Sequence, residues 1–315
     1  MTCLREKAYN ITSNYEENEF AIKMAKCKPV LLLSLLLIEN LGGIYMNRRI
    51  EINENAYVDF YIKDPVLDVG ITGEFNRDLP LLLVLPGGGY SYVSLREGQP
   101  VATRANAYGM HSAVLKYTVL QEDIDVTLDQ LLAEVEFVLD YIDENAHELR
   151  IDTSKIYVAG FSAGGHLASW SSIKFNDRID RAILAYPAVG YGPEYLEEIK
   201  AREEEADLSK YDKNNAKIAL KMAELFSLDP KNAVHDKTPP TFIFTTMDDR
   251  TVPAGNSLRY ATKLYEYNVP LELHCYSVGG HALSLADNTT AVYKHQINPR
   301  VATWVDLAFT WLRTY

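Results

Sequence analysis

A serine lies in the pattern Gly-x-Ser-x-Gly, as Gly160-Phe161-Ser162-Ala163-Gly164, between an apolar run and a helical pattern. In a strand–turn–helix context this pattern predicts a tight turn that strains the serine backbone and exposes its hydroxyl. The flanking glycines let neighbouring backbone pass without collision. We expect the backbone N–H of Ala163, at the start of the helix, to point at an oxyanion. The pattern also occurs by chance, but its context favours Ser162 as a nucleophile.

A serine hydroxyl is a poor nucleophile near neutral pH, so it needs a base, and the base needs a carboxylate to orient it. We expect the chain order Ser, Asp, His, with each residue in a loop after a strand. Asp248 and Asp249 both follow an apolar run. The Asp-x-x-Val-Pro spacing favours Asp249 as the acid and leaves Asp248 as a turn or capping residue. His281 follows the next apolar run after two glycines and is predicted to be the base.

The other histidines are interpreted as structural or exposed residues. His111 and His147 precede the serine, which is outside the required order. His166 lies one helical turn past the serine and is expected to pack in the helix rather than act as the base. His274 lies within a strand pattern, and His295 lies near a charged loop. We therefore predict a single catalytic triad of Ser162, Asp249 and His281.

A glycine-rich loop follows the apolar run at 79–85, in the sequence Pro86-Gly87-Gly88-Gly89. Lipases and esterases carry His-Gly-Gly-Gly at such a position, where backbone N–H groups complete the oxyanion hole. Here proline replaces the histidine. We expect Gly88 and Gly89 to be the donors, because glycine N–H groups can approach a substrate oxygen without a side chain in between. The alternative is an ordinary glycine turn.

These residues predict acyl transfer. Ser162 would attack an ester carbonyl, His281 would take its proton, and Asp249 would hold the imidazole tautomer. Gly88, Gly89 and Ala163 would bind the oxyanion. This chemistry requires no metal and no organic cofactor.

Strand and helix patterns alternate around these residues. Residues 48–62 alternate apolar and polar side chains around an Asn53–Asn55 turn, which predicts an antiparallel hairpin. Strands are expected at 79–85, 112–117, 155–159, 181–186, 241–246 and 271–276, with helices at about 127–145, 254–268 and 300–314. This alternation predicts an α/β protein with a mostly parallel central sheet and helices on both faces. A hairpin that leads into a parallel sheet matches the α/β-hydrolase fold.

Residues 190–238 interrupt the alternation with an acidic stretch and then an apolar stripe at Ile218, Met222, Leu225 and Phe226. Such a stripe needs a surface to cover, so we expect a cap insertion over the site. The alternative is a solvated surface excursion. The hydrolase domain is then expected to span residues 46–315.

The chain has 315 residues and a formal net charge of -12. An acidic surface repels phosphate backbones, so we expect no nucleic-acid partner. Cys3, Cys27 and Cys275 form no Cys-x-x-Cys pair, which excludes a zinc knuckle, and we expect free thiols in a reducing, cytoplasmic compartment. The sequence leaves the oligomeric state open.

Residues 1–45 form an N-terminal extension. Its apolar run at 30–38 is too short for a stable membrane span, which needs about 20 residues. The extension is interpreted as a start-site artefact, since Met46 opens the first structured segment, or as a signal or anchor through residues 22–41, in which case the protein is exported or membrane-anchored. A docked helix is a third alternative.

Several segments resemble bacterial esterases of the acetylxylan esterase and feruloyl-esterase-like (BD-FAE-like) type, within the α/β-hydrolase superfamily. The resemblance covers about residues 48–315. It rests on PGGGY with Arg96-Glu97-Gly98, GFSAGGHLAS, TPPTFIFTTMDDRTVPAGNSL, GGHALSL and NPRVATWVDLAFTWL. It implies the triad and oxyanion loop given above, and a small-molecule ester substrate such as acetyl groups on xylo-oligosaccharides. The long acidic insertion departs from the family pattern.

Two other functions use the same residues differently. A serine peptidase of the prolyl-oligopeptidase type shares the triad, but such enzymes carry a large extra domain that this chain has no room for. A non-catalytic hydrolase-fold binding protein would be expected to lack a triad member, and none is missing. A serine carboxylesterase or acetyl esterase is therefore the preferred prediction.

Overall fold

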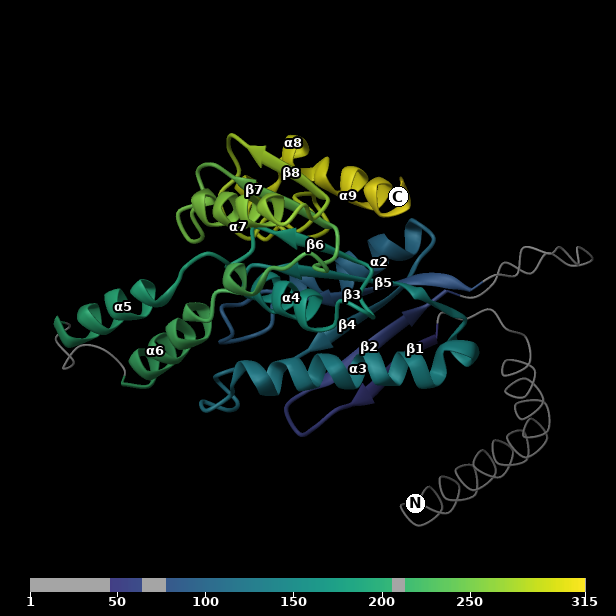
Figure 1. Ribbon diagram of the computed structural model, residues 1–315, viewed down its shortest axis with the longest axis horizontal. Coiled ribbons are helices and arrows are strands. Elements are labelled where there is room, and N and C mark those ends of the chain that lie inside the picture. The colour runs from purple at the N-terminus through teal and green to yellow at the C-terminus, as the bar shows by residue number, and fades with distance from the viewer. Residues whose placement is uncertain (1–45, 64–77, 206–212, 315) are drawn as a thin grey trace, which may run out of the picture. The chain divides into compact units, whose positions relative to one another are not determined.

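The computed structural model describes residues 46–63, 78–205 and 213–314. The predictions made for residues 1–45 lie outside this range. Eight strands form one sheet (Figure 1). They are β1 (Met46–Glu51), β2 (Tyr57–Ile62), β3 (Leu79–Leu85), β4 (His111–Lys116), β5 (Ile151–Phe161), β6 (Arg181–Ala185), β7 (Thr241–Thr246) and β8 (Leu271–Tyr276).

The strand order is β1-β2-β4-β3-β5-β6-β7-β8. The predicted hairpin is confirmed: β1 pairs antiparallel with β2, and β2 pairs antiparallel with β4. From β4 to β8 all pairings are parallel. The interior strands are buried on both faces, as the continuous apolar runs predicted. The α/β-hydrolase prediction is confirmed in this mostly parallel sheet.

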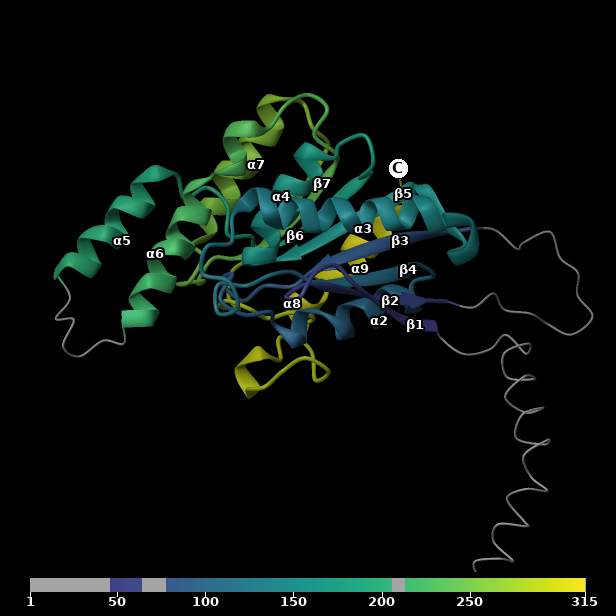
Figure 2. The same cartoon turned by 90° about the horizontal axis from the view of Figure 1, so that it is seen from below.

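Helices cover both faces of the sheet (Figures 1 and 2). One apolar core joins the sheet to α3 (Leu128–Leu149), α4 (Ala163–Lys174) and α7 (Ala254–Glu266). The opposite core joins it to α2 (Gln99–Ala107), α8 (Pro299–Ala302) and α9 (Trp304–Thr314). The helix predicted at 300–314 is thus divided in two. Three 3-10 turns, η1 (Leu95–Glu97), η2 (Pro230–Ala233) and η3 (Lys294–Gln296), lie in connections.

Helix α3 shows how the local sequence sets these elements. The Thr127 side chain caps its first turn by accepting a hydrogen bond from the N–H of Gln130. Val135, Val138 and Ile142, spaced by three and four residues, are fully buried against the sheet. The helix ends where Arg150 takes a left-handed conformation with φ 58°. It continues past the predicted end, because the apolar repeat extends to Leu149.

The direction in which successive strands are added to the sheet reverses at β3, and this reversal determines where the site lies. The connection from β3 through α2 leads to β4 on one side, whereas the connection from β4 through α3 leads to β5 on the other. The carboxyl ends of β3 and β5 therefore lie side by side at the point where the strand order reverses, which is where ligands bind in open α/β sheets. The glycine loop follows β3 and Ser162 follows β5.

Between β6 and β7 the chain forms two further helices, α5 (Pro193–Glu205) and α6 (Lys213–Ser227). They pack against each other and lie side by side in both ribbon views (Figures 1 and 2). Sequence analysis predicted the amphipathic stripe of α6 but no helix at α5, because the acidic run there masks any apolar periodicity. No helix in the described ranges is both long and apolar enough to cross a membrane.

Candidate active site

Ser162 lies at a sharp turn between β5 and α4. Its backbone has φ 53° and ψ -116°, a conformation that non-glycine residues rarely adopt. A side chain is excluded on both flanks: a Cβ at Gly160 would lie 2.2 Å from the carbonyl oxygen of Gly164, and one at Gly164 would lie 2.0 Å from that of Leu85. The two glycines therefore let the turn close. Although Ser162 is the N-cap of α4, its side chain caps nothing, and its hydroxyl is left for another partner.

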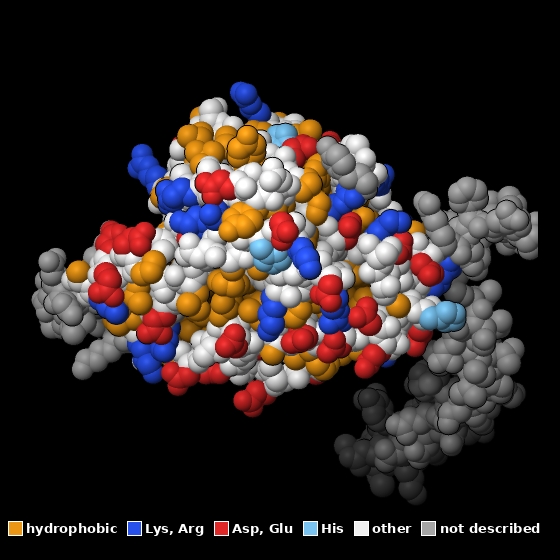
Figure 3. Space-filling model, in the orientation of Figure 1, with side chains coloured by type: hydrophobic (Ala, Val, Ile, Leu, Met, Phe, Trp, Pro, Cys, Tyr) orange, Lys and Arg blue, Asp and Glu red, His pale blue; other side chains and the backbone are white. Residues whose placement is uncertain are grey.

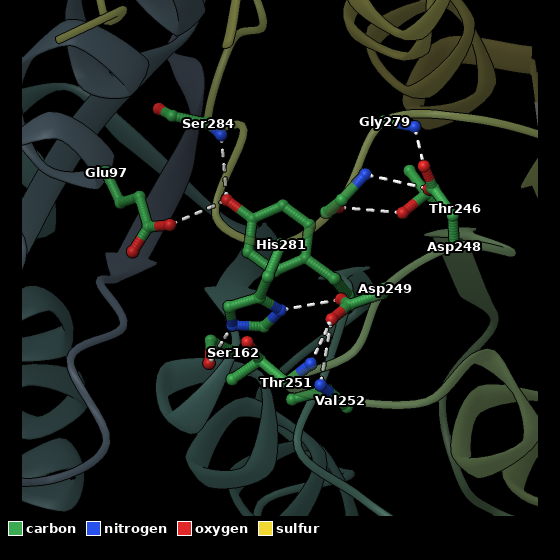
Figure 4. Close-up of polar contacts among 12 residues, drawn as sticks. Glu97, Ser162, Thr246, Asp248, Asp249, Thr251, Val252, Gly279, His281 and Ser284 are labelled. Carbon is green, nitrogen blue, oxygen red and sulfur yellow. Dashed lines mark hydrogen bonds and ion pairs between the residues drawn. The ribbon is translucent and has the colours of Figure 1, made fainter. Parts of the chain in front are cut away.

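That partner is His281. The Ser162 Oγ lies 2.9 Å from His281 Nε2, and His281 Nδ1 lies 2.6 Å from Asp249 Oδ2 (Figure 4). An ionised carboxylate only accepts hydrogen bonds, so Nδ1–H donates to Asp249 and Nε2 accepts from the serine. The structure brings together all three residues of the predicted triad. They come from the loops after β5, β7 and β8.

The neighbouring carboxylates Asp249 and Asp248 have different surroundings. The Asp249 side chain is fully buried, and its second oxygen accepts hydrogen bonds from the N–H groups of Thr251 and Val252 at 2.8 and 2.9 Å. Asp248 points the other way and accepts from the N–H groups of Gly279 and Gly280 at 2.8 and 2.9 Å (Figure 4). These hydrogen bonds hold the pKa of Asp248 below its usual value. Asp248 thus fixes the loop that carries the histidine.

The glycine loop lies directly beside the serine. A Cβ at Gly87 would lie 3.0 Å from the Ser162 Cβ, and one at Gly88, where φ is 129°, would collide with the Tyr92 carbonyl. The N–H of Gly87 is already used, because it donates to Glu97 Oε2 at 2.9 Å. Within the described part of the chain, the N–H groups of Gly88, Gly89 and Ala163 have no hydrogen-bond partner. These three groups are available to a substrate oxygen.

The insertion between β6 and β7 supplies side chains close to these loops. A Cβ at Gly89 would lie 3.1 Å from the Sδ of Met222, so α6 reaches the glycine loop. Tyr191 donates a hydrogen bond to the Thr251 carbonyl at 3.2 Å, on the loop that follows Asp249. The ring of Phe226 lies 5.6 Å from that of Tyr191. Sequence reasoning singled out Met222 and Phe226 as an apolar stripe but missed Tyr191.

His166 is fully buried, as predicted for a packed helix residue. Its Nδ1 lies 2.7 Å from the hydroxyl of Tyr90, which follows the glycine loop, and its Nε2 lies 2.8 Å from the Leu228 carbonyl at the end of the insertion. Burial lowers its pKa from 6.5 to about 4. A neutral His166 therefore ties α4 to the glycine loop and the insertion.

Two polar residues near the triad were not identified as site residues from the sequence. Glu97 is 2% exposed, and Tyr186, just after β6, is fully buried. Tyr186 donates to Glu97 Oε1 at 2.6 Å, and its ring centroid lies 5.1 Å from that of His281. The only sequence signal was the segment Arg96-Glu97-Gly98, which entered as part of a family resemblance.

Comparison with known proteins places this arrangement in a family. The BD-FAE family model matches residues 67–264. The chain is 31% identical over 225 residues to endo-1,4-beta-xylanase B of Butyrivibrio fibrisolvens, covering 66% of this chain and 33% of that protein. It is 27% identical over 229 residues to an acetylxylan esterase of Xylanibacter ruminicola, covering 70% and 44%. The chain thus spans a third to under half of these curated relatives.

A solved structure is similar to this chain over most of its length and is also that of an ester hydrolase. The carboxylesterase Cest-2923 from Lactobacillus plantarum superposes with a TM-score of 0.70 at 26% identity, over 86% of this chain and 97% of that one. Together, these relatives support a hydrolase of the α/β-hydrolase type. On the family match, which covers well over half of its length, this chain belongs to the BD-FAE family.

Proposed function

We propose that this protein is a serine carboxylic-ester hydrolase that acts on small acyl esters, including acetyl groups on xylo-oligosaccharides. The observation that carries the proposal is the continuous hydrogen-bonded path from Ser162 Oγ through His281 to Asp249, at 2.9 and 2.6 Å. Such a path activates a hydroxyl at neutral pH. The acetylxylan esterase and carboxylesterase relatives support the substrate class.

The geometry supports the following reaction. Ser162 Oγ attacks the ester carbonyl carbon while His281 Nε2 takes its proton, and Asp249 stabilises the resulting imidazolium. The N–H groups of Gly88, Gly89 and Ala163 stabilise the charge that develops on the carbonyl oxygen. His281 then protonates the leaving alcohol, and an acyl group remains on Ser162. Water, deprotonated by His281, releases the acyl group as a carboxylate.

The insertion 190–238 is proposed as the cap of the site in residues 46–315, with residues 1–45 as an extension outside the catalytic domain. We also propose that the enzyme works in the cytoplasm. Cys275 is an exposed free thiol, which is typical of a reducing compartment. Fractionation of expressing cells tests this placement, and recovery of the enzyme in a membrane or exported fraction would contradict it.

Hydrolysis of p-nitrophenyl acetate and butyrate by the wild type and by Ser162→Ala tests the function. We expect the variant to fold and to lose turnover by a factor on the order of 10⁴ or more, because the remaining residues cannot form the acyl-enzyme. Release of acetate from acetylated xylo-oligosaccharides then tests the substrate. Equal ester hydrolysis in both proteins would overturn the proposal, and turnover of an aminoacyl-p-nitroanilide instead would indicate the peptidase alternative.

A further inference from the structure

Glu97 is a buried carboxylate whose two oxygens bind different loops. Oε2 accepts a hydrogen bond from the N–H of Gly87 at 2.9 Å, and Oε1 accepts from the hydroxyl of Tyr186 at 2.6 Å. Its exposed fraction is 2%. Burying a carboxylate is costly unless it is well hydrogen-bonded. Because Glu97 is buried beside the glycine loop and binds its backbone, we infer that it has a specific role there.

Tyr186 links Glu97 to the loop that follows β8 and contains His281 and Ser284, here called the histidine loop. Its hydroxyl donates to Glu97 and accepts from the N–H of Ser284 at 2.9 Å (Figure 4). Its ring packs edge-on against the ring of His281. Burial, with the nearby charge of Glu97, raises the pKa of Tyr186 well above its usual value. Tyr186 is therefore a permanent hydrogen-bond donor over the working pH range.

The loop that Tyr186 holds is strained. Ala282 and Ser284 have φ values of 55° and 54°, a left-handed conformation that is unfavourable for a non-glycine residue. Arg96, next to Glu97, donates to the Ala282 carbonyl at 3.1 Å, and the Ser284 hydroxyl donates to the Arg96 carbonyl at 2.7 Å. The adjacent residues 96 and 97 thus keep this loop in a conformation that it would otherwise leave.

We propose that Glu97 is a positioning residue that fixes the glycine loop and the histidine loop relative to each other. It holds the glycine loop through Gly87 and the histidine loop through Tyr186 and Ser284. This role rests on the proposed function, because those loops carry the oxyanion donors and the base. Misplacing reacting groups by about 1 Å can cost 10²-fold in rate. Glu97 touches no substrate and acts through the backbone that it holds.

Glu97→Gln and Tyr186→Phe test the proposal. Glutamine has one acceptor oxygen and one NH2 group, so it cannot accept from both Gly87 and Tyr186, and phenylalanine removes the hydroxyl that binds Glu97. We expect each variant to lower kcat for p-nitrophenyl acetate by about 10- to 100-fold, with KM within about threefold of wild type. The double variant is expected to be no slower than the slower single variant, within about threefold. Residues that act as one unit show such non-additivity.

Glu134→Gln is the matched control. Glu134 is another buried glutamate, 3% exposed, and it accepts hydrogen bonds from the backbone N–H and the hydroxyl of Thr118 at 2.9 and 2.5 Å. It lies on α3 and contacts neither catalytic loop directly. We expect a loss of thermal stability similar to that of Glu97→Gln and an unchanged kcat. Equal kcat losses in the two variants would reduce the role of Glu97 to general stability and overturn the proposal.

A second readout does not depend on activity. Hydrogen–deuterium exchange of residues 281–286 should rise in both Glu97→Gln and Tyr186→Phe and stay at the wild-type level in Glu134→Gln. If activity proves independent of Ser162, the proposed function fails while this exchange still decides the loop contact. Wild-type kcat in a folded Glu97→Gln, or unchanged exchange, overturns the positioning role. Should one variant fail to fold, the other decides alone.

Discussion

At the residue scale, the site depends on two adjacent aspartates whose side chains point in opposite directions. Asp249 is buried and binds His281, whereas Asp248 binds two glycine N–H groups of the histidine loop. Asp249→Asn should lower kcat by about 10⁴-fold, because an amide that donates to Nδ1 favours the wrong imidazole tautomer. Steady-state kinetics on p-nitrophenyl acetate measures the loss.

Asp248→Asn serves as the comparison within the same turn. Its amide oxygen can still accept from Gly279 and Gly280, so we expect a loss on the order of tenfold or less. A larger loss in Asp248→Asn than in Asp249→Asn would reverse the two assignments and contradict the proposed triad.

At the element scale, the insertion decides what reaches the glycine loop. Met222 on α6 lies against Gly89, beside the expected oxyanion donors. We expect the acyl chain of the substrate to extend toward this side chain. Met222→Ala should open this space and raise the ratio of kcat/KM for butyrate to that for acetate by about tenfold. Hydrophobic pockets discriminate by this order for each methylene accommodated or excluded.

Lys221→Ala is the control on the same helix. The Lys221 ammonium forms an ion pair with Glu224, one turn along α6, at 2.9 Å. Removal of the Lys221 side chain therefore changes the surface of the helix but not its contact with the glycine loop. The acyl ratio should stay at the wild-type value. An unchanged ratio in Met222→Ala would show that α6 does not limit the acyl group and would weaken the cap assignment.

At the scale of the whole molecule, buried His166 makes stability depend on pH. Its pKa is about 4 in the folded chain, against 6.5 for an ordinary histidine. Between these values the unfolded chain binds more protons, so the free energy of unfolding falls as pH decreases. Between pH 7.5 and pH 5 this single group should remove roughly 2 kcal/mol of stability.

Urea unfolding of the wild type and His166→Gln at both pH values measures this contribution. The variant should be less stable at pH 7.5, since it loses the contacts to Tyr90 and Leu228, but its stability should fall less on acidification. His295→Gln, which changes an exposed histidine, should follow the wild type. Parallel curves for all three proteins would show that His166 does not stay neutral in the fold.

The distribution of charged side chains over the surface is also a property of the whole molecule. Acidic side chains are spread over the face shown in Figure 3 and are intermixed with Lys and Arg. The whole chain carries a formal net charge of -12.

The sequence by itself determined the sheet, the chain order of the proposed triad and the position of the glycine loop. Continuous apolar runs predict buried parallel strands, and the residue that follows each run must lie at the carboxyl edge of the sheet. Ser162, Asp249 and His281 could be proposed as a triad from the sequence because the chemistry of each residue type is local, and the structure brings the three side chains together. Boundaries were less accurate: Tyr186 was assigned to a strand, yet it leaves β6 with φ 37°.

The tertiary structure alone decided which polar side chains meet across the sheet edge. Glu97, Tyr186 and Ser284 are each separated by about ninety or more residues, so no periodicity or spacing connects them, and their contact depends on how strands β3, β6 and β8 are ordered. The separate orientations of Asp248 and Asp249, and the reach of Met222 to Gly89, likewise follow from packing. Local sequence encodes the reacting groups, whereas the fold encodes the contacts that hold them.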